Sequence, residues 1–140
     1  MKPAHRKQAR VLALQALYAW LMSGNEIKQI ELSIVTTNDM TKVDIEYMQA
    51  ILNGATGDVK ALDLLYKPYL GRLPEELDPI EKSIMRLATV ELRDRLDTPY
   101  KVVINEAIEL AKSFGAEESH KFINGALDKA VKTLRKEERR

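Results

Sequence analysis

The first ten residues of the chain bring together cationic side chains that could bind a polyanion. Lys2, Arg6, Lys7 and Arg10 lie in this stretch, and residues 1–25 contain no aspartate or glutamate. Ammonium and guanidinium groups neutralise phosphates, so the pattern is typical of a nucleic-acid footprint. Charge alone fits a solvated terminus equally well, and both interpretations stay open at this point.

Two phenylalanines near the C-terminus are accompanied by lysines. Phe114 and Phe122 flank Gly115, which separates two helical patterns, and Lys101 and Lys121 lie on the same two predicted helices. A helical hairpin would place rings and cations on one surface. Unpaired bases stack on aromatic rings at about 1–3 kcal/mol each while cations follow the phosphates, which favours single-stranded nucleic acid. A purely structural aromatic pair is the alternative.

Residues that could catalyse a reaction or hold a metal are few. The chain has no cysteine, and its two histidines are His5 and His120. His120 follows Glu117 at the spacing found in di-iron helical bundles, but such a site needs a second motif and two further glutamates. The sequence shows no phosphate-binding glycine loop, nucleophile motif or paired-carboxylate motif. We predict a protein that is not an enzyme, with no catalytic residue, no metal and no other cofactor.

The composition predicts one compact domain. The chain has 140 residues, 45% of them hydrophobic, and a net charge of +1, which suits a single core. It contains no uncharged apolar run near the ~20 residues that span a bilayer, and no signal-peptide pattern. We expect no membrane contact and a cytoplasmic location.

Apolar residues recur every three or four positions, which predicts helices and no strand. We expect an all-α fold of about seven helices in two packed helical bundles within one domain, residues 1–140. The N-terminal half would cover about residues 1–75 and the C-terminal half about residues 76–140. The predicted helices cover approximately residues 3–23, 27–34, 42–56, 59–67, 79–92, 99–114 and 116–134.

The ends of four helices are predicted from local sequence. Thr41 is expected to begin the third helix through a capping box with Asp44. Asp78 and Thr98 each precede a proline, as N-cap residues do, and are expected to cap the fifth and sixth helices. Gly115 is expected to end the sixth helix in the left-handed conformation.

The first helix is apolar over much of its circumference. Val11, Leu14 and Tyr18 fall outside its main apolar stripe, and no charged residue occurs between Arg10 and Glu26. Either the helix runs through the middle of the protein and is covered by both halves, or Tyr18 belongs to an exposed patch that binds another protein.

Five sequence blocks carry a family resemblance: RKQAR at residues 6–10, ALQALY at 13–18, KPYL at 67–70, INEAIELAK at 104–112 and KFINGALD at 121–128. They resemble the NusB family of bacterial transcription antitermination factors, and the likeness extends to about residue 134. The last two blocks are the most specific. Their Asn105, Glu106, Asn124 and Gly125 are interpreted mainly as structural, because a glycine inside a helix usually permits a close helix crossing.

The resemblance implies an all-helical scaffold with an N-terminal and a C-terminal bundle. Members of the family bind the boxA segment of ribosomal RNA leader transcripts together with Nus factor E, a ribosomal small-subunit protein. The pair then joins NusA, NusG and RNA polymerase. By this resemblance the RNA-binding residues would be Lys2, His5, Arg6, Lys7, Arg10, Tyr69, Lys101, Phe114, Lys121 and Phe122. Lys7 stands where the family often has arginine, which removes a bidentate contact.

The resemblance also implies a surface for the ribosomal protein partner. Tyr18, Glu75 and Glu81 would face it, where acids meet a basic chain. For Glu81, capping of a helix is an equal alternative.

A second function is kept as an alternative, namely a NusB-like RNA-binding domain that acts with a ribosomal RNA methyltransferase. The chain ends without a methyltransferase, so we expect no catalysis by it alone. Methylation of ribosomal RNA by the purified chain would contradict the scaffold interpretation.

Overall fold

The computed structural model describes residues 2–138, and this part of the chain is all-α, without a strand. Its elements are the helices α1 (Pro3–Ser23), α2 (Ile27–Thr37), α3 (Ile45–Thr56), α4 (Val59–Tyr66), α5 (Pro79–Asp94), α6 (Tyr100–Phe114) and α7 (Ser119–Leu134), and the short 3-10 turns η1 (Lys67–Tyr69) and η2 (Pro74–Glu76). The predicted fold class and number of α-helices are confirmed for these residues.

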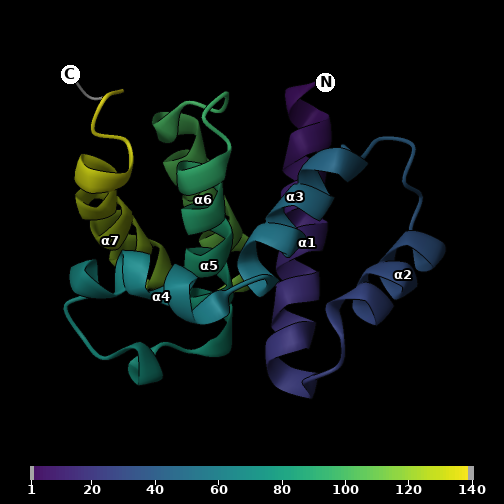
Figure 1. Cartoon of the computed structure of the whole chain (residues 1–140), viewed down its shortest axis with the longest axis horizontal. Helices are drawn as coiled ribbons and strands as arrows, with labels where there is room; N and C mark the ends of the chain where they lie inside the picture. The colour runs from purple at the N-terminus through teal and green to yellow at the C-terminus, as the bar shows by residue number, and fades with distance from the viewer. Residues whose placement is uncertain (1, 139–140) are drawn as a thin grey trace.

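Helix α5 lies at the centre of the molecule. It contacts α1, α3, α4, α6 and α7, and it is buried on all sides over most of its length, as expected of a helix surrounded by others. Helices α1, α2 and α3 form one group beside it and α4, α6 and α7 the other (Figure 1). One apolar core extends through both groups. The boundary near residue 75 stays a prediction. It would place α4 and α7 in different halves, although these two helices contact each other.

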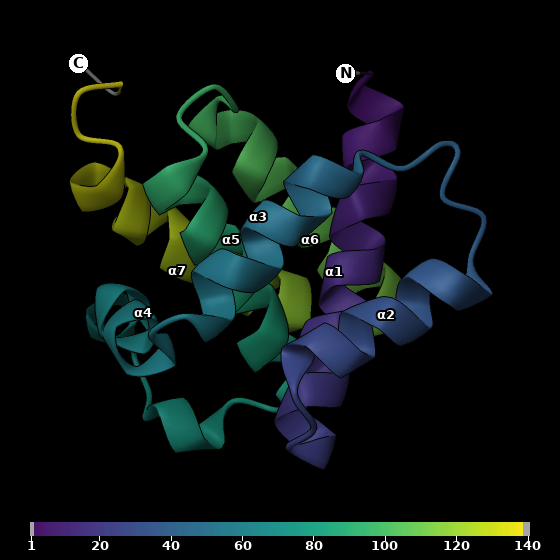
Figure 2. The same ribbon diagram turned by 45° about the vertical axis from the view of Figure 1, so that its right-hand side comes forward.

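The apolar circumference of α1 is explained by its neighbours. Helices α2, α3 and α5 all pack against it, and α2 lies across its C-terminal part (Figure 2). Leu14, outside the main stripe, is 2% exposed, whereas Tyr18 is 37% exposed. The helix is therefore covered on several sides and still presents Tyr18 to solvent.

At the starts of α3 and α6, the predicted residue does not cap the helix. Asp44 itself caps α3 by accepting a hydrogen bond from the Tyr47 amide at 3.1 Å. The Thr41 amide and hydroxyl instead bond the Asp39 carboxylate, so the prediction of a Thr41 cap was wrong. Thr98 is no cap either, because its hydroxyl bonds Arg6 and Tyr47.

The predicted cap at Asp78 is confirmed. Its carboxylate accepts from the Glu81 amide at 2.7 Å, and the Glu81 carboxylate accepts from the Asp78 amide at 3.2 Å. Together they form a reciprocal capping box at the start of α5. Both partners lie within four residues of each other, which is why the local sequence was sufficient.

The turn between α6 and α7 differs from the prediction. Gly115 is extended, with φ −89° and ψ 173°, and the left-handed residue is Glu118, with φ 76°. Helix α7 therefore begins at Ser119 rather than near Ala116. Glycine is required at position 115 by crowding, because an added Cβ would lie 2.8 Å from the Ala111 carbonyl oxygen.

The close helix crossing predicted at Gly125 was also wrong. A Cβ on Gly125 would meet no atom within 4 Å. The crowded glycine is Gly54 on α3, where a Cβ would lie 2.7 Å from Val90 Cγ1 on α5.

Candidate nucleic-acid interface

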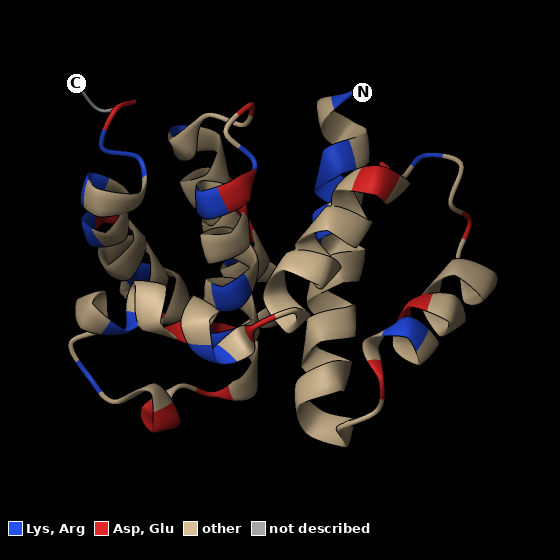
Figure 3. Cartoon of the chain, in the orientation of Figure 1, with Lys and Arg blue, Asp and Glu red and all other residues tan. Residues whose placement is uncertain are grey.

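The cations of α1 are confined to its N-terminal turns, and the remainder of the helix carries no charge (Figure 3). Lys2 and Lys7 are exposed, while His5 is half-buried. The Lys7 ammonium lies 2.9 Å from a carboxylate oxygen of Glu106 on α6. This ion pair joins the exposed edge of α1 to the outer surface of α6.

Arg6 is held by several neighbours at once. Its guanidinium donates to Asp97 at 2.8 Å and to Thr98 at 3.1 Å, and it lies 4.4 Å from the centre of the Tyr47 ring. The hydrogen bond from Arg6 lowers the pKa of the Asp97 carboxyl against the opposing effect of its partial burial, and nearby Arg95 adds to the lowering. Only part of the Arg6 side chain, 22%, stays exposed.

Arg10 belongs to the interior. Its guanidinium donates from Nε and Nη2 to the carboxylate of Glu91 at 2.9 Å each, and Glu91 also accepts from the Tyr47 hydroxyl. Burial alone would lower the pKa of Arg10, but the hydrogen bond and charge of Glu91 outweigh it and the pKa is raised. Burial, reinforced by Glu91, raises the pKa of Tyr47 to about 12.

The burial of Arg10 corrects the expectation that it contacts phosphate. Its side chain is only 4% exposed and its charge is already balanced, so in this structure it holds α1 against α5. Nothing in the local sequence distinguishes Arg10 from Lys7, because the partner, Glu91, is 81 residues away.

Phe114 lies on the same surface as Lys7. Its side chain is 43% exposed, and a pocket of about 170 Å³ between α1 and α6 is lined by Lys7, Val11, Glu106 and Phe114, among others. An aromatic ring and a cation from two helices thus share one site, as a stacking platform beside a phosphate contact requires.

Lys101 lies farther along α6, at a groove between α6 and α7. The groove has a volume of about 530 Å³ and is lined mainly by polar side chains, among them Lys101 and Lys132. Lys121, at the start of α7, is 69% exposed and pairs with Glu118 at 2.7 Å.

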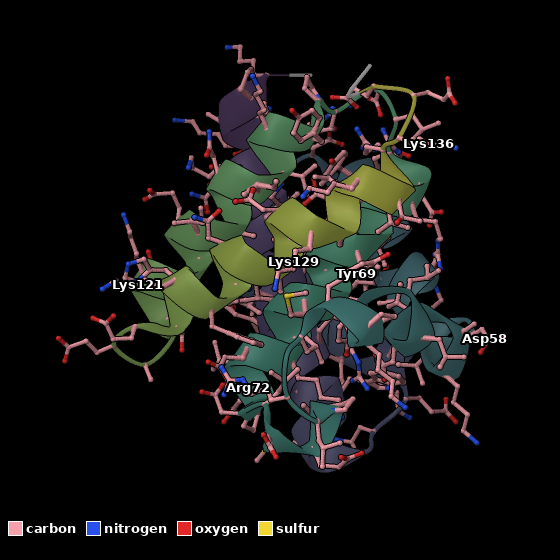
Figure 4. The ribbon with its side chains drawn as sticks, turned by 90° about the vertical axis from the view of Figure 1, so that its left-hand side faces the viewer. Asp58, Tyr69, Arg72, Lys121, Lys129 and Lys136 are labelled. Atoms are coloured by element: carbon pink, nitrogen blue, oxygen red, sulfur yellow. The ribbon has the colours of Figure 1, made fainter. Side chains whose placement is uncertain are left out.

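Tyr69 and Phe122 are on another flank of α7. The Tyr69 hydroxyl bonds the hydroxyl of Thr133 at 2.8 Å, and the guanidinium of Arg72 covers the Phe122 ring at 3.7 Å from its centre. In Figure 4, Lys121 projects well apart from Tyr69 and Arg72. Neither Tyr69 nor Phe122 lines the pocket formed by Lys7 and Phe114.

The residues predicted to face a protein partner differ in exposure. Tyr18 is 37% exposed, and Glu75 is exposed on η2. Glu81 is 6% exposed; besides capping α5 it accepts a hydrogen bond from the Ser119 hydroxyl at 2.9 Å. Glu81 thus joins the starts of α5 and α7, and of the three predicted residues only Tyr18 and Glu75 have exposed side chains.

Residues 2–138 offer no group of three or more acidic, histidine or cysteine side chains arranged to hold a metal ion. In the same range no helix combines the length and the apolar character that crossing a membrane requires. The exposed cations and the exposed Phe114 ring are suited to binding. These features define a helical binding protein with cations and an exposed aromatic ring on one face.

Comparison with known proteins identifies the family. The NusB family model matches residues 7–132. The transcription antitermination protein NusB of Alteromonas mediterranea is 66% identical over 99% of both chains, and that of Escherichia coli O9:H4 is 53% identical over 96% of this chain and 97% of its own. The chain therefore belongs to the NusB family of transcription antitermination proteins, a family that is not enzymatic, and the predicted family, function and absence of enzyme activity are confirmed.

Solved structures show the same fold. NusB of T. maritima superposes with a TM-score of 0.83 at 31% identity, over 99% of this chain and 98% of its own. A crystal structure of the antitermination factors NusB and NusE in complex with dsRNA matches with a TM-score of 0.79 at 24% identity, over 94% of this chain and 98% of that one.

Proposed function

We propose that the chain binds the single-stranded boxA segment of ribosomal RNA leader transcripts together with NusE, the ribosomal small-subunit protein. The observation that carries the proposal is the pocket that the Lys7 side chain and the exposed Phe114 side chain both line. Single strands need both, because bases stack on rings while phosphates follow cations.

The proposed RNA path crosses three helices. Phosphates contact the exposed lysines Lys2, just before α1, Lys7 on α1, Lys101 on α6 and Lys121 on α7, and the partly exposed Arg6 on α1. The Lys121–Glu118 ion pair is at the surface, where such pairs stabilise by only about 0–1 kcal/mol, so phosphate can replace that carboxylate. Glu106 is partly buried, at 16% exposed, but Lys7 itself is 53% exposed and open to phosphate.

Replacing Phe114 with alanine is expected to weaken RNA binding by about 1–3 kcal/mol, the contribution of one stacked base. The exposed ring contributes little to the core, so helicity should be unchanged. Fluorescence anisotropy with boxA RNA and circular dichroism measure the two effects. The matched control is Leu64→Ala on α4, since Leu64 is also an exposed apolar side chain, at 63%. Full RNA affinity in Phe114→Ala would refute the role of this pocket.

For the protein partner we propose the surface around Tyr18. Met22, one helical turn further along α1, is 58% exposed, and Glu75 adds an acid on η2. An aromatic ring with a neighbouring methionine and a rim acid suits a basic partner such as a ribosomal protein. Entry of the pair into a complex with NusA, NusG and RNA polymerase, in the cytoplasm where transcripts are made, extends this proposal.

Tyr18→Ala is expected to weaken binding of NusE by about 2 kcal/mol, because tyrosine is among the residues that dominate interfaces. Calorimetric titration of the variant with NusE measures the loss. Leu32→Ala on α2 is the control, since Leu32 is 64% exposed and lies on a different helix. Equal affinity for wild type and Tyr18→Ala would exclude Tyr18 from the interface.

A further inference from the structure

The groove between α6 and α7 is lined largely by polar side chains that stabilise no other part of the described structure. Asn105 on α6 and Asn124 and Asp128 on α7 all line it and are exposed. Lys101 and Lys132 lie at the end where α6 begins and α7 ends. Within residues 2–138, none of these five side chains forms a hydrogen bond or ion pair. Their polar atoms are free to bind a ligand.

The free groups match the edge of a nucleobase. Asn124 and Asp128 are four residues apart on one helix, which separates their Cβ atoms by about 5–6 Å, similar to the width of a base edge. A carboxylate accepts two N–H bonds, and a carboxamide both donates and accepts. Guanine presents two adjacent donors, at N1 and N2, and acceptors at O6 and N7, so that Asp128 suits its donors and the carboxamides suit its acceptors.

We propose that this groove is a base-reading subsite for an unpaired guanine. Asp128 accepts from N1 and N2 of the base, and Asn105 and Asn124 bind its acceptor atoms, while Lys101 and Lys132 hold the neighbouring phosphates. The inference rests on the proposed function, because the same strand first has to cross α1 and α6.

The two lysines favour RNA over a basic protein as the occupant. Lys101 and Lys132 both line the groove without a paired acid, and they would repel the lysines and arginines of a ribosomal protein. Asp128 alone would repel phosphate, but a carboxylate is suited to the N–H groups of a base edge.

The test compares three RNAs on the full chain: one with guanine in boxA, one with inosine, which lacks the N2 amine, and one with adenine. Wild type is expected to bind the guanine RNA roughly tenfold more tightly than the adenine RNA, with inosine between them. Asn105→Ala, Asn124→Ala and Asp128→Asn are expected to reduce this discrimination to about twofold or less. Lys101→Ala should weaken all three RNAs equally, because phosphates carry no sequence information.

A second variant separates binding from folding. Asn105→Leu is expected to keep the melting temperature, since position 105 is exposed and leucine favours helix, and to lower RNA affinity roughly tenfold by filling the groove that Asn105 lines. Gln29→Leu, at an exposed position on α2, is the matched control and should leave RNA affinity unchanged. Asn105→Leu with full RNA affinity would overturn the subsite.

The outcomes also separate this inference from the proposed function. Unchanged discrimination in all three side-chain variants, with RNA binding still weakened by Phe114→Ala, overturns the subsite and leaves the proposed function standing. Failure of the wild-type chain to bind boxA RNA, alone or with NusE, overturns both. If the three side-chain variants bind NusE more weakly but still discriminate between the RNAs, the groove binds a protein and the subsite is overturned.

Discussion

Replacing Glu91 with alanine is expected to destabilise the protein by about 3–5 kcal/mol. Glu91 is 0% exposed, and its carboxylate receives the Arg10 guanidinium and the Tyr47 hydroxyl. Without it, the buried Arg10 cation keeps only its longer contact with Glu106, at 3.3 Å, and the Tyr47 hydroxyl keeps only Thr98. Removing the main partner of a buried charge is among the few single changes that cost this much.

Thermal and urea denaturation measure the effect, and the melting temperature should fall by roughly 10–20 °C. The double variant Arg10→Met with Glu91→Leu is expected to recover most of the loss, because apolar side chains of similar size can replace a buried ion pair. Glu46→Ala is the control: its carboxylate pairs with Arg95 at 2.8 Å but is 70% exposed, so the loss should stay within about 1 kcal/mol. Equal losses in Glu91→Ala and Glu46→Ala would contradict the prediction.

The buried cluster also positions the proposed RNA surface. The guanidinium groups of Arg6, Arg10 and Arg95 all lie within 5.3 Å of the centre of the Tyr47 ring. Two of the three arginines come from α1, so its N-terminal turns are fixed to α3, α5 and the segment before α6. Lys2 and Lys7 consequently project from a rigid helix rather than from a loose terminus, which reduces the ordering cost of binding.

Sequence was sufficient for features whose causes are local. Helical periodicity and the Asp78 capping box involve residues one turn apart, and both predictions are confirmed. Thr98 does not cap α6, because its hydroxyl accepts a hydrogen bond from Arg6, 92 residues away. A local sequence pattern cannot predict such competition, because it contains no information about distant partners.

The candidate site was predictable in residue type but not in exposure. The sequence indicates cations on α1, yet whether one faces solvent depends on partners such as Glu91, far along the chain. In the same way Phe122 is covered by Arg72, while Phe114 stays exposed. Asn105 and Asn124 were interpreted as structural, because only the packed helices show that both line an open groove.

Raising the salt concentration from 50 to 200 mM is expected to weaken RNA binding roughly 100-fold. The proposed surface offers four exposed lysines and the partly exposed Arg6, and five phosphate contacts on a single strand give a slope of log affinity against log salt of about −3.5. The four lysines are Lys2, Lys7, Lys101 and Lys121. Anisotropy titrations at several salt concentrations measure the slope.

Single variants make the salt prediction specific to these residues. Lys7→Ala should make the slope shallower by about 0.7, the contribution of one single-strand phosphate contact. Lys60→Ala, which removes an exposed lysine from α4, should leave both slope and affinity unchanged. Arg10→Met tests the interior assignment, because a buried, paired arginine releases no counterion: its slope should equal that of wild type even where folding is weakened. A slope near zero for the wild-type chain, or equal effects of Lys7→Ala and Lys60→Ala, would show that RNA does not follow this face of α1.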